Sequence, residues 1–381
     1  MAKPSVSVAM ATYNGAKYVK QQLLSISNQS CPPNEIIVSD DGSSDETLEI
    51  IREFANFAPF PVKILSNAEN MGYAQNFGIA LSQCGGDIVF LSDQDDVWRP
   101  NKIEVVLSRF AAEPQIELLI HDLEFCNGDL IPIGQTKIER VRGMTNVDKN
   151  YVVGMATAIR ARFLKHCLPI PNVPGLSHDR WVHTCAYALG RKQIMPEVLA
   201  LYRRHSSNVS IFNPLNSATK LTPCATRILS LTKILRKPMY KAQLLLMNDS
   251  DVTLLANWLA DKRLPLIAEG FATGQEIDTL SALEAERSQI ILERKRILKL
   301  PRWKRLSAVG RLLASGKYRK LFTWKSAVRD FLVLLRRSGS ASTSPDFPDT
   351  PIRGRIVKSE AKATAGTLPA WNASSPRSRK S

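Results

Sequence analysis

Short apolar runs that end in polar clusters recur along the first hundred residues of the chain. The runs at residues 6–11, 35–39 and 88–92 have the length of strands, and each is followed by a polar segment. Residues 62–65 predict a further strand, and residues 72–83 predict a further helix. This alternation from residue 5 to about 115 predicts an α/β fold with a mostly parallel sheet and flanking helices. Residues 117–148 are less regular and are expected to contribute loops.

The run at residues 88–92 ends in Asp93, Asp95 and Asp96, three carboxylates within four positions. Open α/β sheets bind ligands at the carboxyl ends of their strands, and unpaired carboxylates there are costly unless a cation is bound. Oxygen ligands in this number suit Mg²⁺ or Mn²⁺, with substrate phosphates completing the coordination. The pattern therefore predicts a site for a metal and a diphosphate. The alternative is an Asp-rich turn that caps a helix beginning near Pro100.

A second acidic cluster follows the run at residues 35–39. Asp40 and Asp41 come first, and Ser43 and Glu46 then have the spacing of a capping box. This spacing predicts a helix whose apolar positions face the sheet, namely Leu48, Ile51 and Phe54. Since the first strand also leads into a polar loop at residues 12–15, three strands are expected to end in polar clusters at one edge.

These segments resemble the inverting nucleotide-sugar glycosyltransferases of family 2, which have the GT-A fold. The resemblance rests on residues 8–14, 37–45, 70–76 and 91–100, in that order and spacing. It implies a nucleotide diphosphate sugar as donor and a divalent cation, Mn²⁺ or Mg²⁺, held by Asp95 with Asp96 or Asp93 assisting. The residues that it implies for binding the nucleotide sugar are Thr12, Tyr13, Asp40, Asp41, Asn76 and Asp93. Tyr13 is equally consistent with simple packing.

Two later segments extend the resemblance. Residues 175–181 resemble the acidic motif of the acceptor side, which makes Asp179 the candidate general base, although His178 replaces the usual Glu. Residues 201–210 resemble a segment of bacterial polysaccharide transferases and make His205 a neighbour of the diphosphate or metal. A histidine with ordinary surface or core packing is the alternative for both His178 and His205. The signature Gln-x-x-Arg-Trp of processive synthases is absent, which favours transfer of a single sugar.

The length of 381 residues predicts two or three units. We expect a catalytic domain at residues 1–212, a helical region at residues 213–337 and a disordered tail at residues 338–381. The helical region is expected to be a packing module up to about residue 300 and to be basic and amphipathic toward its end. Six scattered cysteines without a C-x-x-C pair indicate neither a zinc site nor a disulfide framework, and favour a reducing compartment. Neither a signal peptide nor an apolar run long enough for a membrane span is expected.

Basic residues are concentrated towards the C-terminus. Residues 294–337 hold fifteen Lys and Arg residues against one acidic residue, a net charge of +14 within a chain total of +16. The interleaved apolar residues, which include Trp303, Phe322, Trp324 and Phe331, favour an amphipathic segment that binds an anionic membrane surface. A solvated helix face is the alternative, and nucleic acid is the least favoured partner. The expected location is cytoplasmic, peripheral on the inner face of the cell membrane.

The sequence thus predicts transfer of one sugar with inversion to a saccharide acceptor, lipid-linked by expectation, in cell-surface polysaccharide biosynthesis. One competing function is that of a nucleotidyltransferase, which normally has a Gly-rich, Arg-containing loop that residues 11–15 lack. The other is a non-catalytic protein that binds nucleotides or nucleic acid, which has no need of carboxylates at three strand ends. The sugar and the acceptor are not identified, although segments 91–98 and 178–181 look most like transferases for rhamnose or related sugars.

Overall fold

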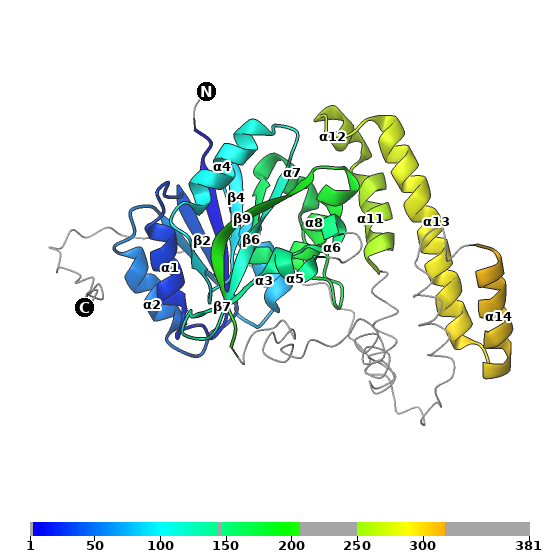
Figure 1. The fold of residues 1–381 in the computed structure, drawn as a ribbon, viewed down its shortest axis with the longest axis horizontal. Coiled ribbons are helices and arrows are strands. Elements are labelled where there is room, and N and C mark those ends of the chain that lie inside the picture. Colours follow the sequence, from blue (N-terminus) through cyan, green and yellow to red (C-terminus); the bar gives the residue numbers. More distant parts are fainter. Residues whose placement is uncertain (1–2, 143–146, 206–249, 317–381) are drawn as a thin grey trace. The chain divides into compact units, whose positions relative to one another are not determined.

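The computed structural model describes residues 3–142, 147–205 and 250–316. These residues form one sheet with helices on both faces, followed by a group of helices (Figure 1). The strands are β1 (Val6–Thr12), β2 (Glu35–Asp40), β3 (Val62–Ser66), β4 (Ile88–Ser92), β5 (Val97–Trp98), β6 (Leu118–Cys126), β7 (Pro132–Thr136), β8 (Thr157–Arg160) and β9 (Lys192–Arg203). The helices between them are α1 (Val19–Ser27), α2 (Thr47–Ala55), α3 (Tyr73–Ser82), α4 (Lys102–Ala112), α5 (Lys137–Val141), α6 (Val147–Asn150), the 3₁₀ turn η1 (Gly154–Ala156), α7 (Ala161–Cys167) and α8 (His178–Ala188). The later helices are α11 (Ser250–Asp261), α12 (Arg263–Ala268), α13 (Gly274–Lys299) and α14 (Arg302–Ala314).

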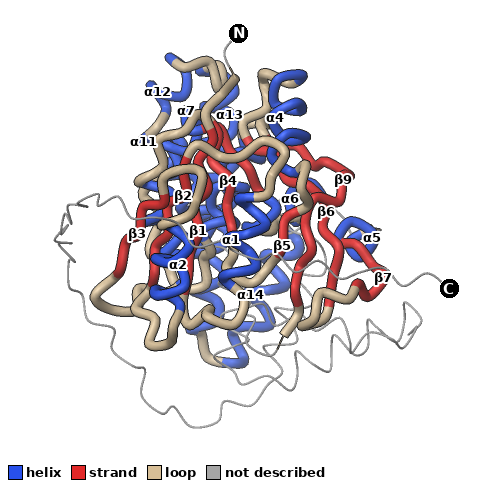
Figure 2. The backbone as a smooth tube through the Cα atoms, turned by 90° about the vertical axis from the view of Figure 1, so that its left-hand side faces the viewer, coloured by secondary structure: helices blue, strands red, loops and turns tan. Residues whose placement is uncertain are grey.

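The sheet has a parallel half and a mixed half. In the first half, β3, β2, β1 and β4 are neighbours in that order and all pair in parallel (Figure 2). In the second half, β8 is antiparallel to both β4 and β6, whereas β6 and β9 are parallel. The predicted α/β fold class with a helical region after it is confirmed. The sheet is mostly parallel only in its first half, because short connections such as the one between β6 and β7 reverse the chain direction.

Strand β6 lies in the segment that was expected to be irregular. Its sequence is interrupted by His121 and Asp122, and both side chains are nevertheless buried. The Asp122 carboxylate accepts hydrogen bonds from the Tyr151 hydroxyl at 3.1 Å and from the Ile138 backbone N–H at 2.9 Å. Because buried polar groups are stable when they are hydrogen-bonded, these partners allow a polar pair inside a buried strand. A sequence pattern that counts apolar positions does not detect such a strand.

Alternate residues of the central strands enter two hydrophobic cores, as strand geometry requires. On one face Val8 and Met10 of β1 pack with residues of α1, α2 and α4. On the other face Ala9 of β1 packs with residues of α3, α7 and α8, including Phe77 and Trp181. Both cores lie under the same strand ends, so the loops that follow β1, β2 and β4 are supported from both sides of the sheet.

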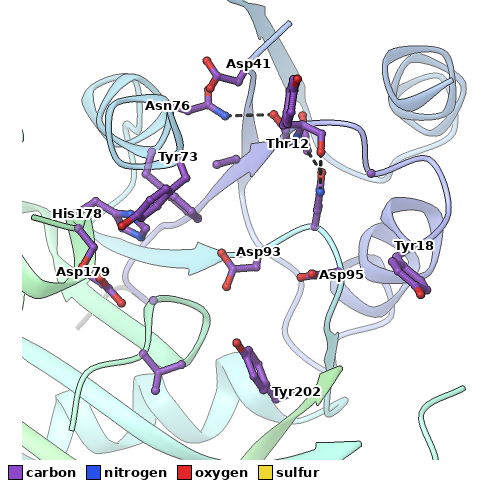
Figure 3. A pocket seen from close by; sticks show the side chains of 18 of the residues that line it. Thr12, Tyr18, Asp41, Tyr73, Asn76, Asp93, Asp95, His178, Asp179 and Tyr202 are labelled. Atoms are coloured by element: carbon purple, nitrogen blue, oxygen red, sulfur yellow. Dashed lines mark hydrogen bonds between the residues drawn. The ribbon is translucent and has the colours of Figure 1, made fainter. Parts of the chain in front are cut away.

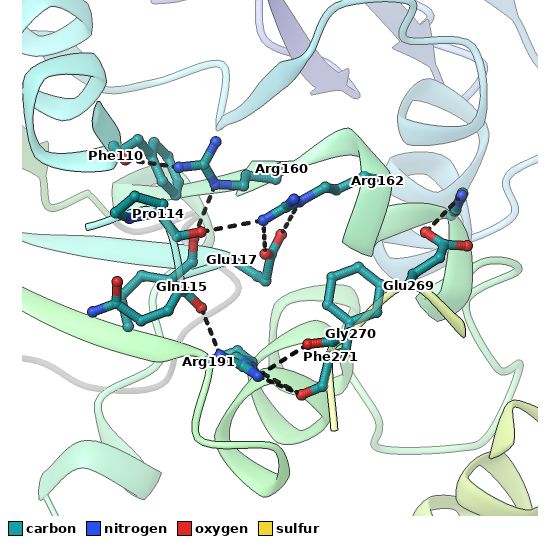
Figure 4. Close-up of polar contacts among 12 residues, drawn as sticks. Phe110, Pro114, Gln115, Glu117, Arg160, Arg162, Arg191, Glu269, Gly270 and Phe271 are labelled. Carbon is teal, nitrogen blue, oxygen red and sulfur yellow. Dashed lines mark hydrogen bonds and ion pairs between the residues drawn. The ribbon is translucent and has the colours of Figure 1, made fainter. Parts of the chain in front are cut away.

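The later helices extend the second core. Trp258 of α11 is 6% exposed and its indole N–H donates to the His166 carbonyl oxygen at 2.7 Å. The Arg191 guanidinium, which precedes β9, donates to the Phe271 carbonyl oxygen at 2.7 Å and to the Gly270 carbonyl oxygen at 3.3 Å (Figure 4). Helices α11 and α12 are therefore joined to the α/β part by apolar packing and by directed hydrogen bonds. The remaining apolar positions of the helical region before residue 250 lie outside the described residues.

Helices α13 and α14 pack against each other through a small apolar cluster of their own, which includes Ile290, Ile297, Val309 and Leu312. Helix α13 begins with a capping box formed by Thr273 and Glu276. Among the helices of the described ranges, none is long and apolar enough to cross a membrane. The aromatic residues of the basic segment after residue 316, and the tail at residues 338–381, lie outside the described residues.

One predicted helix start was wrong in detail. Ser43 does not cap α2, because its hydroxyl donates to the Asp40 carboxylate at 2.6 Å and α2 begins only at Thr47. Instead the Thr47 backbone N–H donates to the Asp45 carboxylate at 3.1 Å. Helix α4 follows Asn101 without a side-chain cap, so the acidic cluster after β4 does not serve as the cap of a helix near Pro100.

Candidate functional site

A large open pocket lies at the carboxyl ends of β1 and β4, where the predicted polar clusters meet (Figure 3). Eight of the ten residues that the sequence nominated line this pocket: Thr12, Tyr13, Asp41, Asn76, Asp93, Asp95, Asp179 and His205. Asp40 and Asp96 do not line it. The structure therefore brings residues from six separate segments to one site, as strand ends in an open α/β sheet predict.

The side chains of Thr12 and Asp40 form hydrogen bonds with other groups of the protein. Thr12 is 1% exposed and its hydroxyl donates to the fully buried Asp40 carboxylate at 2.7 Å. Asp40 also accepts hydrogen bonds from the backbone N–H and hydroxyl of Ser43. With these bonds Asp40 joins the end of β1 to the loop after β2. Tyr13, the next residue, is 48% exposed and lies on the pocket wall.

Asp41 and Asn76 shape the floor of the pocket. The Asp41 carboxylate is 2% exposed and accepts from the backbone N–H groups of Met71 and Gly72, each at 2.8 Å. It also accepts from the Asn67 amide at 2.9 Å. The Asn76 amide donates to the Thr12 carbonyl oxygen at 3.2 Å. Both side chains thus hold the turn before α3 against the end of β1.

The carboxylates after β4 have different surroundings. Asp95 reaches the pocket and its Oδ2 lies 2.8 Å from Nε2 of His205, whose ring contacts Tyr18. Asp96 is fully buried below the pocket, and its Oδ1 accepts from the Arg203 backbone N–H at 2.9 Å. Burial and the charges of Asp95 and Asp93 raise the pKa of Asp96 well above its usual value. Asp96 is therefore placed to hold the strand end, whereas Asp93 and Asp95 face the pocket.

Asp93 lies between Asp95 and Asp179 in the pocket (Figure 3). Burial, together with the negative charges of Asp95 and Asp179, raises the pKa of Asp93 to about 8 against an opposing effect of Lys102. These three pocket carboxylates are an excess of negative charge that a divalent cation would relieve. The hard oxygen donors of Asp93 and Asp95 therefore fit Mg²⁺ or Mn²⁺. Within the described ranges, no group of three or more His, Cys, Asp or Glu residues is preformed as a metal site, so substrate oxygens would have to complete the coordination.

Lys102 is a functional neighbour that the sequence analysis missed. Its side chain is fully buried, its ammonium donates to the Met155 carbonyl oxygen at 2.7 Å, and it lies 3.6 Å from the Trp98 ring centroid. Burial lowers the pKa of Lys102 well below its usual value, and the carboxylates of Asp96 and Asp93 oppose this shift. A signal was present in the sequence, because Lys102 occupies the apolar face of α4 together with Val106 and Phe110.

Gln94 and Arg203 are further missed residues, and both fix the acidic loop. The Gln94 amide accepts from the Tyr13 backbone N–H and donates to the Tyr13 carbonyl oxygen, both at 2.9 Å. The Arg203 guanidinium donates to the Asp95 carbonyl oxygen at 2.8 Å and to the Gln21 amide oxygen at 2.6 Å. The cationic side chains of Lys17, Lys137 and Arg204 also line the pocket. They supply positive charge suited to a diphosphate.

Asp179 lies on the first turn of α8, where Ser177 is the N-cap and accepts from the Arg180 backbone N–H. Burial raises the pKa of Asp179, but His178, the hydrogen bond with Ser177 and the Arg180 backbone N–H together bring it below its usual value. Burial lowers the pKa of His178 to about 4, so this imidazole is neutral at neutral pH. Its ring stacks on Phe77 with centroids 3.8 Å apart. Asp179 is therefore an ionised carboxylate on the pocket wall, able to accept a proton.

Comparison with known proteins agrees with this geometry. Residues 7–166 match the family model described as glycosyl transferase family 2. An uncharacterized glycosyltransferase of Nostoc sp. is 27% identical over 213 residues, which cover 53% of this chain and 66% of the relative. The Escherichia coli enzyme WfgD, a UDP-Glc:alpha-D-GlcNAc-diphosphoundecaprenol beta-1,3-glucosyltransferase, is 27% identical over 177 residues, which cover 46% of this chain and 68% of the relative.

The matched part spans 68% of the length of WfgD, but only 32% of the length of another relative, an uncharacterized glycosyltransferase of Haemophilus influenzae. Among solved structures, Staphylococcus aureus TarS 1-349 in complex with UDP-GlcNAc aligns over 87% of this chain and 90% of the TarS chain, with 17% identity and a TM-score of 0.46.

Proposed function

We propose that this protein, whose residues 7–166 match the family model of glycosyl transferase family 2, moves one sugar from a nucleotide diphosphate sugar to a saccharide acceptor, with inversion at the anomeric carbon. The observation that carries this proposal is the single pocket that joins Asp93 and Asp95 to Asp179 across the end of β4. One group of carboxylates suits the leaving diphosphate and its cation, and the opposite carboxylate suits the acceptor hydroxyl.

On the donor side, Asp95 and Asp93 would hold Mg²⁺ or Mn²⁺ together with the diphosphate. The cation would supply charge neutralisation for the departing nucleoside diphosphate. Arg203 holds the Asp95 backbone, and His205 contacts the Asp95 carboxylate, so the protein fixes this side chain before the donor binds. Lys17, Lys137 and Arg204 would contact the diphosphate, and Tyr13 would stack on the nucleobase.

On the acceptor side, Asp179 would remove the proton of the attacking hydroxyl. A carboxylate whose pKa is below its usual value is ionised at neutral pH, which this role requires. Attack from the face opposite to the leaving diphosphate inverts the anomeric centre. Asp179 and Asp95 come from different elements, α8 and the loop after β4, so the reacting sugar would lie between them.

The acceptor is proposed to be lipid-linked, and the pathway to be the synthesis of a cell-surface polysaccharide. Support comes from WfgD, whose name gives a diphosphoundecaprenol-linked acceptor and a nucleotide-sugar donor. The net charge of +14 at residues 294–337 supports docking on an anionic membrane from the cytoplasmic side. Such docking would bring a lipid-linked saccharide to the pocket without a membrane-spanning segment.

The test uses Asp95→Asn beside wild type and the surface variant Glu69→Ala. A panel of nucleotide sugars is titrated by calorimetry with Mn²⁺ and with a chelator, and nucleoside diphosphate release is followed with saccharide acceptors. We expect metal-dependent binding of one donor class to wild type and to Glu69→Ala, and its loss together with turnover in Asp95→Asn. Equal metal-dependent binding and turnover by Asp95→Asn would refute the proposed donor site.

A further inference from the structure

Two large aromatic side chains of the pocket are strongly exposed, and the proposed mechanism uses only one of them. Tyr13 is 48% exposed on the nucleotide side, and Tyr73 is 46% exposed beside Asp179. Figure 3 shows Tyr73 between Asn76 and the pair formed by His178 and Asp179. An exposed aromatic ring on the wall of a ligand pocket is a contact surface for an apolar face of a ligand.

The position of Tyr73 is fixed by the turn before it. Gly72, the N-cap of α3, has φ of +80°, a backbone conformation that residues other than glycine rarely adopt. The backbone N–H groups of Met71 and Gly72 both donate to the Asp41 carboxylate at 2.8 Å. Tyr73 is therefore presented to the pocket by a turn that internal hydrogen bonds hold in one conformation.

The ring of Tyr73 is also supported from behind. It meets the His178 ring edge to face, with centroids 6.2 Å apart and an interplanar angle of 75°. His178 in turn stacks on Phe77, which lies one turn after Tyr73 on the same face of α3. We call Tyr73, Phe77 and His178 the aromatic wall. Such edge-to-face and offset contacts are the favoured arrangements of aromatic pairs.

The aromatic wall carries no formal charge at neutral pH, although it adjoins a carboxylate. His178 is buried and neutral, and neither of its ring nitrogens has a hydrogen-bond partner among the described residues. The ring also lies close to the backbone of η1, since a Cβ atom added to Gly154 would lie 3.0 Å from Nε2 of His178. The site thus combines a rigid apolar surface with an adjacent hydrogen-bond acceptor, Asp179.

We propose that the aromatic wall is the acceptor subsite, where an apolar face of a pyranose ring stacks on Tyr73 while one of its hydroxyls reaches Asp179. This inference rests on the proposed function, because it takes Asp179 as the proton acceptor. A pyranose has the required shape, with C–H groups on its faces and hydroxyl groups at its edge. The donor nucleotide is assigned to the part of the pocket that Tyr13 and Lys17 line.

Tyr73 is the specificity-determining residue of this subsite, and its substitution separates the two substrates. Tyr73→Ala removes the stacking surface, whereas Tyr73→Phe keeps it and removes only the hydroxyl. Tyr187→Ala is the matched control, because Tyr187 is 40% exposed on the last turn of the same α8 that carries Asp179 and does not line the pocket. All variants are made in the full chain.

The experiment measures binding of methyl pyranosides of glucose, N-acetylglucosamine and rhamnose by ligand-observed saturation-transfer NMR, and of nucleoside diphosphate with Mn²⁺ by calorimetry. We expect Tyr73→Ala to weaken pyranoside binding at least tenfold and to change nucleotide affinity less than twofold. Tyr73→Phe should remain within threefold of wild type for both, and Tyr187→Ala should match wild type.

Three results would overturn the inference: no pyranoside binding to wild type, unchanged pyranoside binding in Tyr73→Ala, or a loss of nucleotide affinity that identifies Tyr73 as a nucleobase contact. Failure of the proposed function has a different signature. In that case wild type would release no nucleoside diphosphate from any donor, whether or not pyranoside binding depends on Tyr73.

Discussion

The family resemblance and the structure imply different roles for Asp41. The resemblance implies that Asp41 binds the nucleotide, whereas in the structure its carboxylate already accepts three N–H groups, from Asn67, Met71 and Gly72, at 2.8–2.9 Å. A hydrogen bond to a charged group contributes about 1.5–3 kcal/mol, and such contributions are not additive. We therefore expect Asp41→Ala to lower the free energy of unfolding by about 3–6 kcal/mol, a large share of the stability of a typical domain.

Asp41→Asn gives a graded version of the same change. Its amide oxygen can still accept two of the three hydrogen bonds, but its NH₂ group would face the third donor. The expected loss is about 1.5–3 kcal/mol, the value of one charged hydrogen bond. Both variants should also loosen the turn that presents Tyr73.

The assay is urea unfolding followed by tryptophan fluorescence, with nucleotide binding measured under conditions where each variant is folded. Glu69→Ala is the matched control, since it removes an exposed acidic side chain from the same segment. Wild-type stability in Asp41→Ala, combined with a tenfold or larger loss of nucleotide affinity, would show that Asp41 acts on the ligand and would refute the structural argument.

Three further predictions address the base, acid stability and the membrane. Asp179→Asn should lower kcat about 10²- to 10⁴-fold in steady-state assays while leaving the donor dissociation constant unchanged, and a near-normal kcat would reassign the base. Because burial lowers the pKa of His178 to about 4, the unfolded chain binds a proton between about pH 6.5 and pH 4 that the native chain does not. Unfolding free energy should therefore fall by up to about 3 kcal/mol as pH decreases through this window, and His178→Gln should reduce that slope in pH-dependent urea titrations. Deleting residues 317–381, which keeps the paired helices α13 and α14, removes a net charge of +10 and should weaken sedimentation with anionic vesicles in low salt; equal sedimentation of both forms would exclude these residues from membrane docking.

The positions of the strand ends could be predicted from the sequence because they depend on local pattern. A short apolar run followed by Asp or Thr indicates where a strand leaves the core, and β1, β2 and β4 all end in this way. The pairing of strands after α4 could not be predicted in the same manner. Whether β8 lies beside β4 or at an edge depends on contacts between residues about seventy positions apart, such as Ile88 and Arg160, and periodicity carries no information about them.

The roles of individual carboxylates could not be predicted from the sequence either. Asp95 and Asp96 are neighbours and chemically identical, yet one lines the pocket and the other is buried against the Arg203 backbone. The chain bends at residues 94 and 95, and the partner that binds the Asp96 carboxylate is the backbone N–H of Arg203 in β9, more than a hundred residues later. The burial of Lys102 could not be predicted for the same reason, because its partner is distant in the sequence. Its ammonium donates to the carbonyl oxygen of Met155 in η1 at 2.7 Å.

The distribution of charge explains why a cation and a diphosphate would bind this pocket together. Asp93, Asp95 and Asp179 place negative charge in the centre, and the pKa of Asp93, raised to about 8 by burial and by its two neighbours, measures how poorly the protein alone compensates that charge. Lys17, Lys137 and Arg204 place positive charge elsewhere on the wall. A divalent cation would relieve the carboxylates and a diphosphate would add negative charge beside these basic side chains, whereas a diphosphate alone would be repelled by Asp93 and Asp95. The two ligands together would satisfy both groups of charges, which supports the proposal that the pocket binds a metal-bound nucleoside diphosphate.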